Sequence, residues 1–184
     1  MSADTVDAIL MASGFSTRFG QKNKLLQPLA GKPLAQHALE LATRSPIFSK
    51  VYFVCADPGL AKIAHAYPVK IIYNQNPGLG QRESVRLGVL SSWANHYLFL
   101  PCDQPFLDIN TVTALLAGRK PQYIISPIYN GKTGSPSIFS CFYRQELLAL
   151  QEGESGRTIK QRYPGNLVNV EISSPWPLFD IDTP

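Results

Sequence analysis

Five short, continuous runs of apolar and β-branched residues recur along this 184-residue sequence and alternate with amphipathic stretches. Because the runs are continuous, they predict strands that are buried on both faces of a sheet. The stretches between them have the length of crossover helices. The alternation predicts an α/β fold, a three-layer sandwich with a mainly parallel sheet. The expected strands are residues 6–11, 51–55, 69–73, 97–100 and 123–126, and the expected helices are residues 33–43, 60–66, 83–93 and 109–116.

The pattern changes after Ser126, where shorter elements follow one another. We expect these elements to pack on the same sheet, because no repeat, low-complexity tract or linker divides the chain. Residues 1–184 are therefore expected to form a single domain. The elements predicted here are strands at residues 137–140 and 167–172 and helices at residues 143–150 and 156–163.

Composition and charge exclude several classes of protein. No apolar run approaches the roughly 20 residues of a membrane-spanning helix, and the N-terminus is acidic and polar, unlike a signal peptide. The net charge is +4 with only 16% charged residues, too little for a non-specific nucleic-acid binder. Cys55, Cys102 and Cys141 form no CxxC pair, so neither a disulfide framework nor a structural zinc site is indicated. We expect a cytoplasmic protein with neither a nucleic-acid nor a membrane partner.

The loop after the first strand combines small residues with cations. It reads Met11-Ala12-Ser13-Gly14, followed by Arg18, Lys22 and Lys24. Small side chains let backbone amides approach an anion, which Arg18 and Lys24 can neutralise. Neither the GxxxxGK[ST] nor the GxGxxG pattern is present, which disfavours a P-loop NTPase and a dinucleotide-binding dehydrogenase. The alternative is a surface loop with solvated cations.

Carboxylates follow the fourth strand and recur at the end of the sequence. Asp103 comes directly after the strand, where it is either a ligand suited to Mg²⁺ or a turn cap. Asp180 and Asp182 are two residues apart, so they would point the same way from an extended segment. A metal site results if that segment passes beside Asp103; as a surface tail it would have no function.

Two further loops contain glycine, and they follow or precede predicted strands. The turn that starts at Asn76 passes through Gly80 into a helix carrying Ser84 in its first turn, where amide donors and the helix dipole favour anions. A second loop contains Gly134-Ser135-Pro136. His37, His65 and His96 lie in or beside predicted helices, and Cys102 has no nearby histidine. None of these four residues is expected to be catalytic.

Taken together, these segments resemble the MobA-like nucleotidyltransferase family of the molybdenum cofactor, and within it the cytidylyltransferase (MocA-type) branch. The resemblance spans residues 7–184. It rests on Leu10-Met11-Ala12-Ser13-Gly14 with Arg18, Gly20 and Lys24, on Gly78, Gly80, Ser84 and Gly88, on Cys102-Asp103-Gln104-Pro105, and on Gly134-Ser135-Pro136 followed by Asp180-Ile181-Asp182-Thr183-Pro184.

The resemblance implies that the three-layer α/β sandwich is Rossmann-like, of the nucleotide-diphospho-sugar transferase-like kind. It also implies transfer of CMP from CTP to molybdopterin with release of pyrophosphate. It implies that Arg18, Lys24 and Asp103 are catalytic and that Mg²⁺ is held by Asp103 and Asp182, with Asp180 a weaker candidate. The implied nucleotide-binding residues are Met11, Ala12, Ser13, Gly14, Arg18, Lys24, Asn76, Gly80 and Ser84. Gly134, Ser135 and Pro136 would shape the pterin side. The implied partners are CTP, molybdopterin and a molybdenum hydroxylase apoenzyme.

Departures from the family pattern bear on the base and on the end of the chain. The guanylyl-using branch has two glycines in place of Ser13-Gly14 and Asp-Met-Pro in place of Asp103-Gln104-Pro105, so both positions favour CTP. Ser13 also replaces the Ala or Gly usual in both branches. Relatives continue into a helix after Asp-Thr-Pro, so here that helix is expected to be lost or replaced by a partner surface.

Several alternatives stay open. One is a guanylyltransferase or a sugar-phosphate nucleotidyltransferase with the same chemistry. Another is a non-catalytic accessory protein that delivers the finished cofactor, and the last is a degenerate α/β domain without a ligand.

The positive charge is local. Four cations and no acid lie between Ala8 and Leu39, so the remaining charges balance. This predicts a local phosphate-binding potential on a nearly neutral protein.

Overall fold

A mainly parallel sheet runs through the protein. In this computed structural model the described residues are 4–14, 23–44 and 46–181. Within them the main sheet has eight strands in the order β10-β7-β9-β6-β1-β4-β5, with β8 paired to β7, and β2 and β3 form a separate hairpin. The strands are β1 (Val6–Ala12), β2 (Pro28–Leu29), β3 (Lys32–Pro33), β4 (Lys50–Cys55), β5 (Lys70–Tyr73), β6 (His96–Pro101), β7 (Ile124–Tyr129), β8 (Lys132–Thr133), β9 (Ser137–Ser140) and β10 (Leu167–Glu171).

The direction of the strands confirms the predicted sheet. β1 pairs in parallel with both β4 and β6, and the pairs β4–β5 and β7–β10 are also parallel. β9 is antiparallel to both of its neighbours, β6 and β7. The sheet is therefore mainly parallel with one reversed strand inside it, which is the α/β arrangement expected from the sequence.

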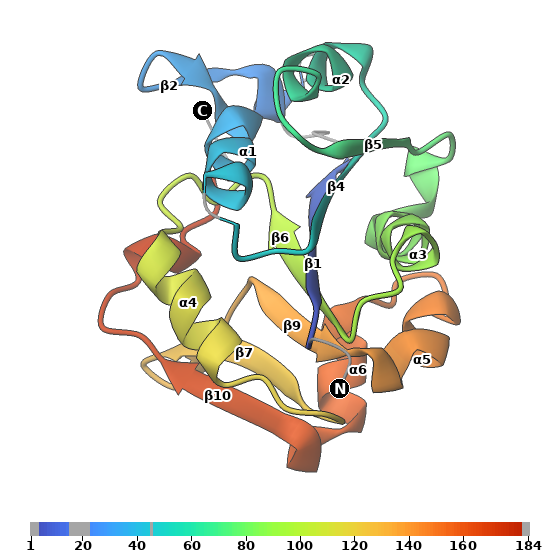
Figure 1. Cartoon of the computed structure of the whole chain (residues 1–184), viewed down its shortest axis with the longest axis vertical. Coiled ribbons are helices and arrows are strands. Elements are labelled where there is room, and N and C mark those ends of the chain that lie inside the picture. The colour runs from blue at the N-terminus through green and yellow to red at the C-terminus, as the bar shows by residue number, and fades with distance from the viewer. Residues whose placement is uncertain (1–3, 15–22, 45, 182–184) are drawn as a thin grey trace.

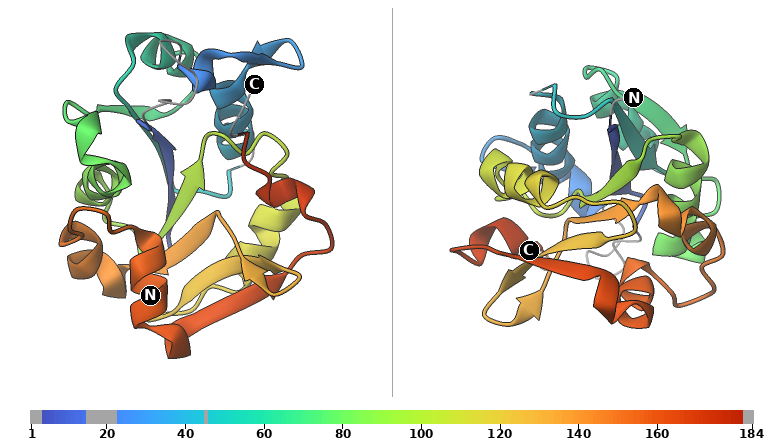
Figure 2. Two further views of the ribbon diagram at one scale, coloured as in Figure 1. Left: turned by 180° about the vertical axis from the view of Figure 1, so that it is seen from behind. Right: turned by 60° about the horizontal axis from the view of Figure 1, so that its bottom comes forward.

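Helices cover both faces of the sheet. In Figure 1, α1 and α4 lie on one side of the sheet while α3, α5 and α6 lie on the other. Figure 2 shows the same three layers from behind. The helices are α1 (Leu34–Thr43), α2 (Pro58–Ala64), α3 (Gln81–Ser91), α4 (Ile109–Ala117), α5 (Arg144–Leu148) and α6 (Gly156–Arg162), with 3₁₀ turns η2 (Lys24–Leu26), η3 (Pro77–Leu79), η4 (Cys141–Tyr143), η5 (Pro164–Asn166) and η6 (Trp176–Leu178).

Alternate residues of the central strand β1 feed two hydrophobic cores. Ala8 and Leu10 pack in the core beneath α1, α2 and α4, whereas Ile9 packs in the core beneath α3, α5 and α6. Successive side chains of a strand point to opposite faces, so a strand covered on both sides is mainly apolar. This requirement explains why the run at the start of the sequence is continuous. The exception in β1 is the buried Asp7, whose Oδ2 accepts a hydrogen bond of 2.6 Å from the Ser92 hydroxyl.

The predicted elements are confirmed with shifted boundaries, and one detail is wrong. Residues 69–73 were expected to be a strand buried on both faces, but β5 is an edge strand with Lys70 and Tyr73 exposed. A continuous apolar run does not reveal whether a second neighbour pairs with it. The hairpin of β2 and β3 and the short β8 were not predicted, because a strand of two residues is too short to show a pattern of apolar residues in the sequence.

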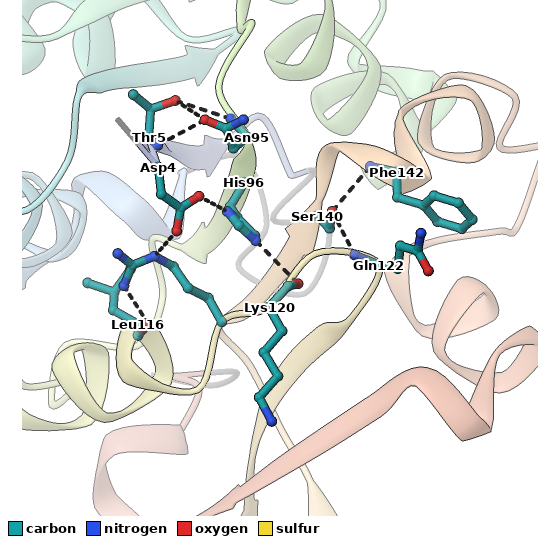
Figure 3. A network of polar contacts seen from close by, with 10 residues as sticks. Asp4, Thr5, Asn95, His96, Leu116, Lys120, Gln122, Ser140 and Phe142 are labelled. Atoms are coloured by element: carbon teal, nitrogen blue, oxygen red, sulfur yellow. Dashed lines mark hydrogen bonds and ion pairs between the residues drawn. The ribbon is translucent and has the colours of Figure 1, made fainter. Parts of the chain in front are cut away.

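His96, which the sequence places beside a helix, is the buried first residue of β6. Its Nδ1 lies 3.2 Å from Oδ1 of Asp4, whose Oδ2 accepts a hydrogen bond of 2.9 Å from Nε of Arg119. The Nε2 atom faces the Lys120 carbonyl oxygen at 3.4 Å (Figure 3). This network lies at the amino end of β6 and ties residues before β1 to the end of α4. It agrees with a structural role for His96.

None of the helices in the described ranges is long and apolar enough to cross a membrane.

Gly88 allows α3 to lie close to β1. A Cβ at this position would lie 2.4 Å from Cγ2 of Ile9, which is buried in the sheet. Ile is branched at Cβ and has little freedom to turn away.

We expect Gly88→Ala to lower the free energy of unfolding by about 1–2 kcal/mol, because overpacking outweighs the gain in helix propensity. Urea unfolding measures the change. Gly165→Ala is the matched control, since the exposed Gly165 has open space around it, and it should change stability by less than about 0.5 kcal/mol. A Gly88→Ala protein as stable as wild type would contradict this account of the packing.

Candidate active site

The loop after β1 begins at the carboxyl edge of the sheet, where ligands bind in open α/β folds. Ala12 is buried in the core, and the Ser13 hydroxyl donates a hydrogen bond of 3.0 Å to the Val54 carbonyl oxygen. Ser13 thus ties the loop to β4, and its hydroxyl is used inside the protein. The substitution of Ser for the usual Ala or Gly is therefore accommodated without projecting a side chain from the loop.

Gly14 follows at the exposed end of this loop. A Cβ built on Gly14 would have none of the described atoms within 4 Å. Nothing in the described part of the protein therefore requires a glycine here. Among the described residues, no atom occupies the space beside it.

Lys24 and Asp103 come together although 79 positions separate them in the sequence. The Lys24 Nζ atom donates to Oδ2 of Asp103 at 2.8 Å and to the carbonyl oxygen of Ile181 at 3.1 Å. The backbone N–H of Ile181 donates to the Asp103 carbonyl oxygen at 2.9 Å. The terminal segment thus passes beside Asp103. This is the arrangement that the sequence analysis requires for a metal site formed by Asp103 and the terminal carboxylates.

The turn η2 fixes the backbone of Lys24. Leu25 is buried in the core, and the Asn23 side chain accepts from the Leu25 N–H at 3.0 Å. The same side chain donates to Asp57 at 3.0 Å, and Asp57 also caps α2 through Gly59. An apolar anchor and a chain of local hydrogen bonds therefore place the lysine at the sheet edge.

The amino end of α3 forms another wall. Gly80 caps the helix with φ of +74°, a conformation that a side chain strongly disfavours. Ser84 is buried in the first turns, while Asn76 is exposed in the preceding loop. Gln81 approaches Met11 with its Nε2 atom 3.9 Å from the sulfur. The helix start and the β1 loop are therefore neighbours, as expected.

Asn74 is a residue of this edge that the sequence analysis missed. It is buried directly after β5, where its backbone N–H donates to the Cys55 carbonyl oxygen at 2.8 Å. Its Oδ1 accepts from the Asn76 N–H at 2.9 Å, but its Nδ2 is buried with no hydrogen-bond partner among the described residues. A buried, unmet amide donor is costly in a folded protein and can be satisfied by a ligand.

The loop that contains Gly134 and Ser135 lines a cavity of about 650 Å³, together with Gln104 and Asp180. A Cβ on Gly134 would come within 2.7 Å of Leu178 Cδ1, so this glycine lets the terminal segment lie against the loop. Pro136 is buried at the base of the loop. The cavity therefore lies between two segments that the sequence predicted separately.

Three cations in this cavity were not predicted. Lys132, Arg157 and Lys160 line it, and Arg157 and Lys160 also line an adjoining cavity of about 100 Å³ that reaches Met11 and Gln81. The available signal was the spacing of Arg157 and Lys160, three positions apart on an expected helix and so on one face. It is weak, because most such pairs face solvent.

The described residues supply a sparse donor set for a metal ion. Within residues 4–14, 23–44 and 46–181, no cluster of three or more His, Cys, Asp or Glu side chains is present. Asp103 is half-buried, and Asp180 precedes Ile181, whose main chain bonds to Lys24 and Asp103. One or two carboxylates plus substrate phosphates are the usual ligands of Mg²⁺, so this set fits a metal that is completed by substrate and not an all-protein cage.

Two predicted residues, Arg18 and Asp182, lie outside the described residues. Their expected roles in phosphate and metal binding remain predictions.

Comparisons with known proteins bear on the family. A family model described as MobA-like NTP transferase domain matches residues 8–167. The chain is 36% identical over 110 residues to a 2-C-methyl-D-erythritol 4-phosphate cytidylyltransferase of Chlamydia abortus, covering 59% of this chain and 48% of the relative. It is 29% identical over 113 residues to a molybdenum cofactor guanylyltransferase of Shewanella halifaxensis, covering 61% of this chain and 54% of the relative. The matches span about half the length of these relatives.

Solved structures share the fold over nearly the whole chain. A nucleotidyl transferase from Methanothermobacter thermautotroptrophicus has a TM-score of 0.83 at 17% identity, covering 97% of this chain and 92% of that chain. A manganese complex of a protein from Mycobacterium tuberculosis H37Rv has a TM-score of 0.74 at 18% identity, covering 97% and 94%. These likenesses confirm the fold class that the sequence predicts.

We expect Ser13→Ala to lower the free energy of unfolding by about 1 kcal/mol, because it removes a buried hydrogen bond to β4. Thermal and urea unfolding measure the loss. The exposed Ser173, for which no side-chain hydrogen bond is seen within the described ranges, provides the control Ser173→Ala. Equal stability of the two variants would show that the Ser13 contact contributes nothing.

Proposed function

Because the chain belongs to the MobA-like NTP transferase family, we propose that it transfers CMP from CTP to the phosphate of molybdopterin and releases pyrophosphate. The observation that carries the proposal is the meeting of Lys24, Asp103 and the Ile181 carbonyl at the carboxyl edge of the sheet. A cation, a carboxylate and a main-chain oxygen from three distant segments converge at the sheet edge where the loop with Ser13 and Gly14 begins.

The reaction is a single displacement at the α-phosphorus. An oxygen of the acceptor phosphate forms a new bond to that phosphorus, and the bond from phosphorus to the bridging oxygen of the β-phosphate breaks. The leaving pyrophosphate keeps the bridging oxygen and its electron pair. Such a transfer requires positioning and charge stabilisation instead of a protein nucleophile.

Lys24 is the described residue best placed to stabilise that charge. Its ammonium already lies in a partly buried position against two oxygens, so it is oriented before substrate arrives. Arg18, by family resemblance, supplies a second cation on the triphosphate. The loop backbone at residues 12–14 and the start of α3 at Gly80 and Ser84 would contact the nucleotide.

Mg²⁺ is the proposed metal. Asp103 would hold it, with Asp182 or Asp180 as the second carboxylate. When bound, it would neutralise phosphate charge and polarise the phosphoryl oxygens.

CTP is the preferred nucleotide in this proposal. Ser13-Gly14 and Asp103-Gln104-Pro105 depart from the guanylyl-using pattern. The similarity to a cytidylyltransferase supports the same choice, whereas the similarity to guanylyltransferases favours GTP as the second candidate.

Molybdopterin is the proposed acceptor, with a molybdenum hydroxylase apoenzyme as the recipient of the product. The acceptor would enter the 650 Å³ cavity beside Gly134 and Ser135, which adjoins Asp180 and Gln104. Its size suits a ligand such as a pterin.

The test incubates the protein with molybdopterin, Mg²⁺ and, separately, CTP and GTP, and follows pyrophosphate. We expect release with CTP. Release with GTP alone would support the guanylyltransferase, and no release from either would reject the proposal. A non-catalytic delivery protein would still transfer preformed cofactor to the apoenzyme after Arg18→Ala or Asp103→Ala.

We expect Asp103→Asn to lower kcat for pyrophosphate release by at least about 100-fold, because it removes the charge that holds the metal and pairs with Lys24. Glu152→Gln, at an exposed position in the loop after α5, serves as the charge-matched control. Comparable activity of the two variants would exclude Asp103 from the chemistry.

Gly14→Ala separates a structural from a ligand-binding role for this glycine. The added methyl group meets none of the described atoms within 4 Å, so the melting temperature should stay unchanged, while the KM for CTP should rise by about tenfold or more through contact with the nucleotide. Stopped-flow or steady-state titration with CTP measures the effect. An unchanged KM would place the nucleotide elsewhere.

A further inference from the structure

Lys160 is a half-buried lysine that lines the 650 Å³ cavity proposed for the acceptor, called the acceptor cavity below. The reaction proposed above assigns it no role. Its Nζ atom lies 3.2 Å from the Ser137 hydroxyl, 3.4 Å from the Ser126 hydroxyl and 3.4 Å from the Gly134 carbonyl oxygen. All three partners are neutral and the contacts are long. Among the described residues Lys160 has no carboxylate within ion-pair distance.

A purely structural role does not require this charge. The Ser126 and Ser137 hydroxyls already bond to each other at 2.8 Å, so both remain satisfied without the lysine. Burial and the neighbouring Arg157 lower the pKa of Lys160 to about 8, so the folded protein holds an ammonium in an unfavourable place. Such an uncompensated charge lowers stability and is expected where a ligand supplies the counter-charge.

The surroundings of Lys160 indicate that this ligand is negatively charged. Lys132 and Arg157 line the same cavity, and Asp180 is the carboxylate among the lining residues. Arg157 and Lys160 stand one turn apart on α6, where two like charges repel unless an anion lies between them. The cavity therefore favours an anionic ligand.

The position of Lys160 indicates which part of the acceptor it meets. Lys160, Arg157 and Ser135 belong to the lining of both the acceptor cavity and the smaller cavity that reaches Met11 and Gln81. Met11 lies near the end of β1, directly before the loop proposed to bind the nucleotide, and Gln81 is the first residue of α3. Lys160 thus lies at the passage from the acceptor cavity to the nucleotide side, where an acceptor phosphate must lie to attack the α-phosphorus.

We propose that Lys160, assisted by Arg157, binds the phosphate of the acceptor and positions it for attack. The inference rests on the proposed function and deepens it: the acceptor is a phosphate monoester whose dianion replaces the missing counter-charge of Lys160. Ser126 and Ser137 hold the ammonium in place, and the Gly134 carbonyl directs it toward the passage.

The experiment compares Lys160→Met and Lys160→Arg with the wild type. Lys120→Met is the matched control, since Lys120 is exposed and lies beside His96 at the amino end of β6, opposite the proposed site. Steady-state kinetics with molybdopterin and CTP should show that Lys160→Met raises the KM for molybdopterin at least about tenfold and leaves the KM for CTP within about twofold. Lys160→Arg should retain part of the acceptor affinity.

Two further measurements do not depend on turnover. Calorimetric titration with inorganic phosphate should show a binding component in the wild type and in Lys120→Met that weakens at least about tenfold in Lys160→Met. The melting temperature of Lys160→Met should equal or exceed that of the wild type, because an unfavourably buried charge is gone.

Unchanged phosphate binding together with an unchanged KM for molybdopterin would overturn the proposal. A lower melting temperature with both affinities unaltered would also overturn it, since the lysine would then be a structural link between β7 and β9. If the wild type releases no pyrophosphate, the proposed function fails, but the phosphate titration still decides whether Lys160 binds an anion.

Discussion

The ammonium of Lys24, held between the Asp103 carboxylate and the Ile181 carbonyl, connects three segments that the sheet alone would leave apart. One segment follows β1, one follows β6, and one lies at the end of the described chain. The Ile181 N–H completes the link by bonding to the main chain of Asp103. Since Leu178 of the same terminal segment also packs against Gly134, this link helps to form the acceptor cavity. The candidate site thus depends on one charged contact at the carboxyl edge.

Charge is distributed differently in the folded protein than along the sequence. The first loop and its flank hold a local excess of cations, but the fold places Glu40 against Lys32 and Asp103 against Lys24. A second group of cations, Lys132, Arg157 and Lys160, gathers at the acceptor cavity from segments that look electrically unremarkable in the sequence. Among the described residues, the cations of the first loop and its flank are therefore paired with carboxylates, and cations without a carboxylate partner gather at the cavity proposed for the anionic acceptor.

The sequence predicted most of the secondary structure, because buried strands and amphipathic helices leave distinct periods. It also indicated the loops after the strands as candidate ligand sites, since ligands in such folds bind at the carboxyl ends of strands, and the structure brings Lys24 and Asp103 from two of these loops into contact. It did not predict the edge position of β5, whose Ile71 and Ile72 read like core residues. It also missed Asn74 and Lys160. An asparagine after a strand and a lysine on a short helix are common in sequences and do not by themselves indicate a site. They indicate one only when the fold buries them, so that the Asn74 amide lacks a hydrogen-bond partner among the described residues and the Lys160 ammonium lacks a counter-charge there.

By itself, the sequence determined the layered α/β architecture, the loop after β1 and the resemblance to nucleotidyltransferases, because these depend on local pattern and spacing. Only the tertiary structure decided that the terminal segment lies beside Asp103, that Ser13 faces β4 and that three unpredicted cations line one cavity. The reason is physical: strand order, helix packing and burial bring together side chains that are distant along the chain. Whether a polar side chain is buried away from water depends on this packing, so a local sequence pattern does not predict it.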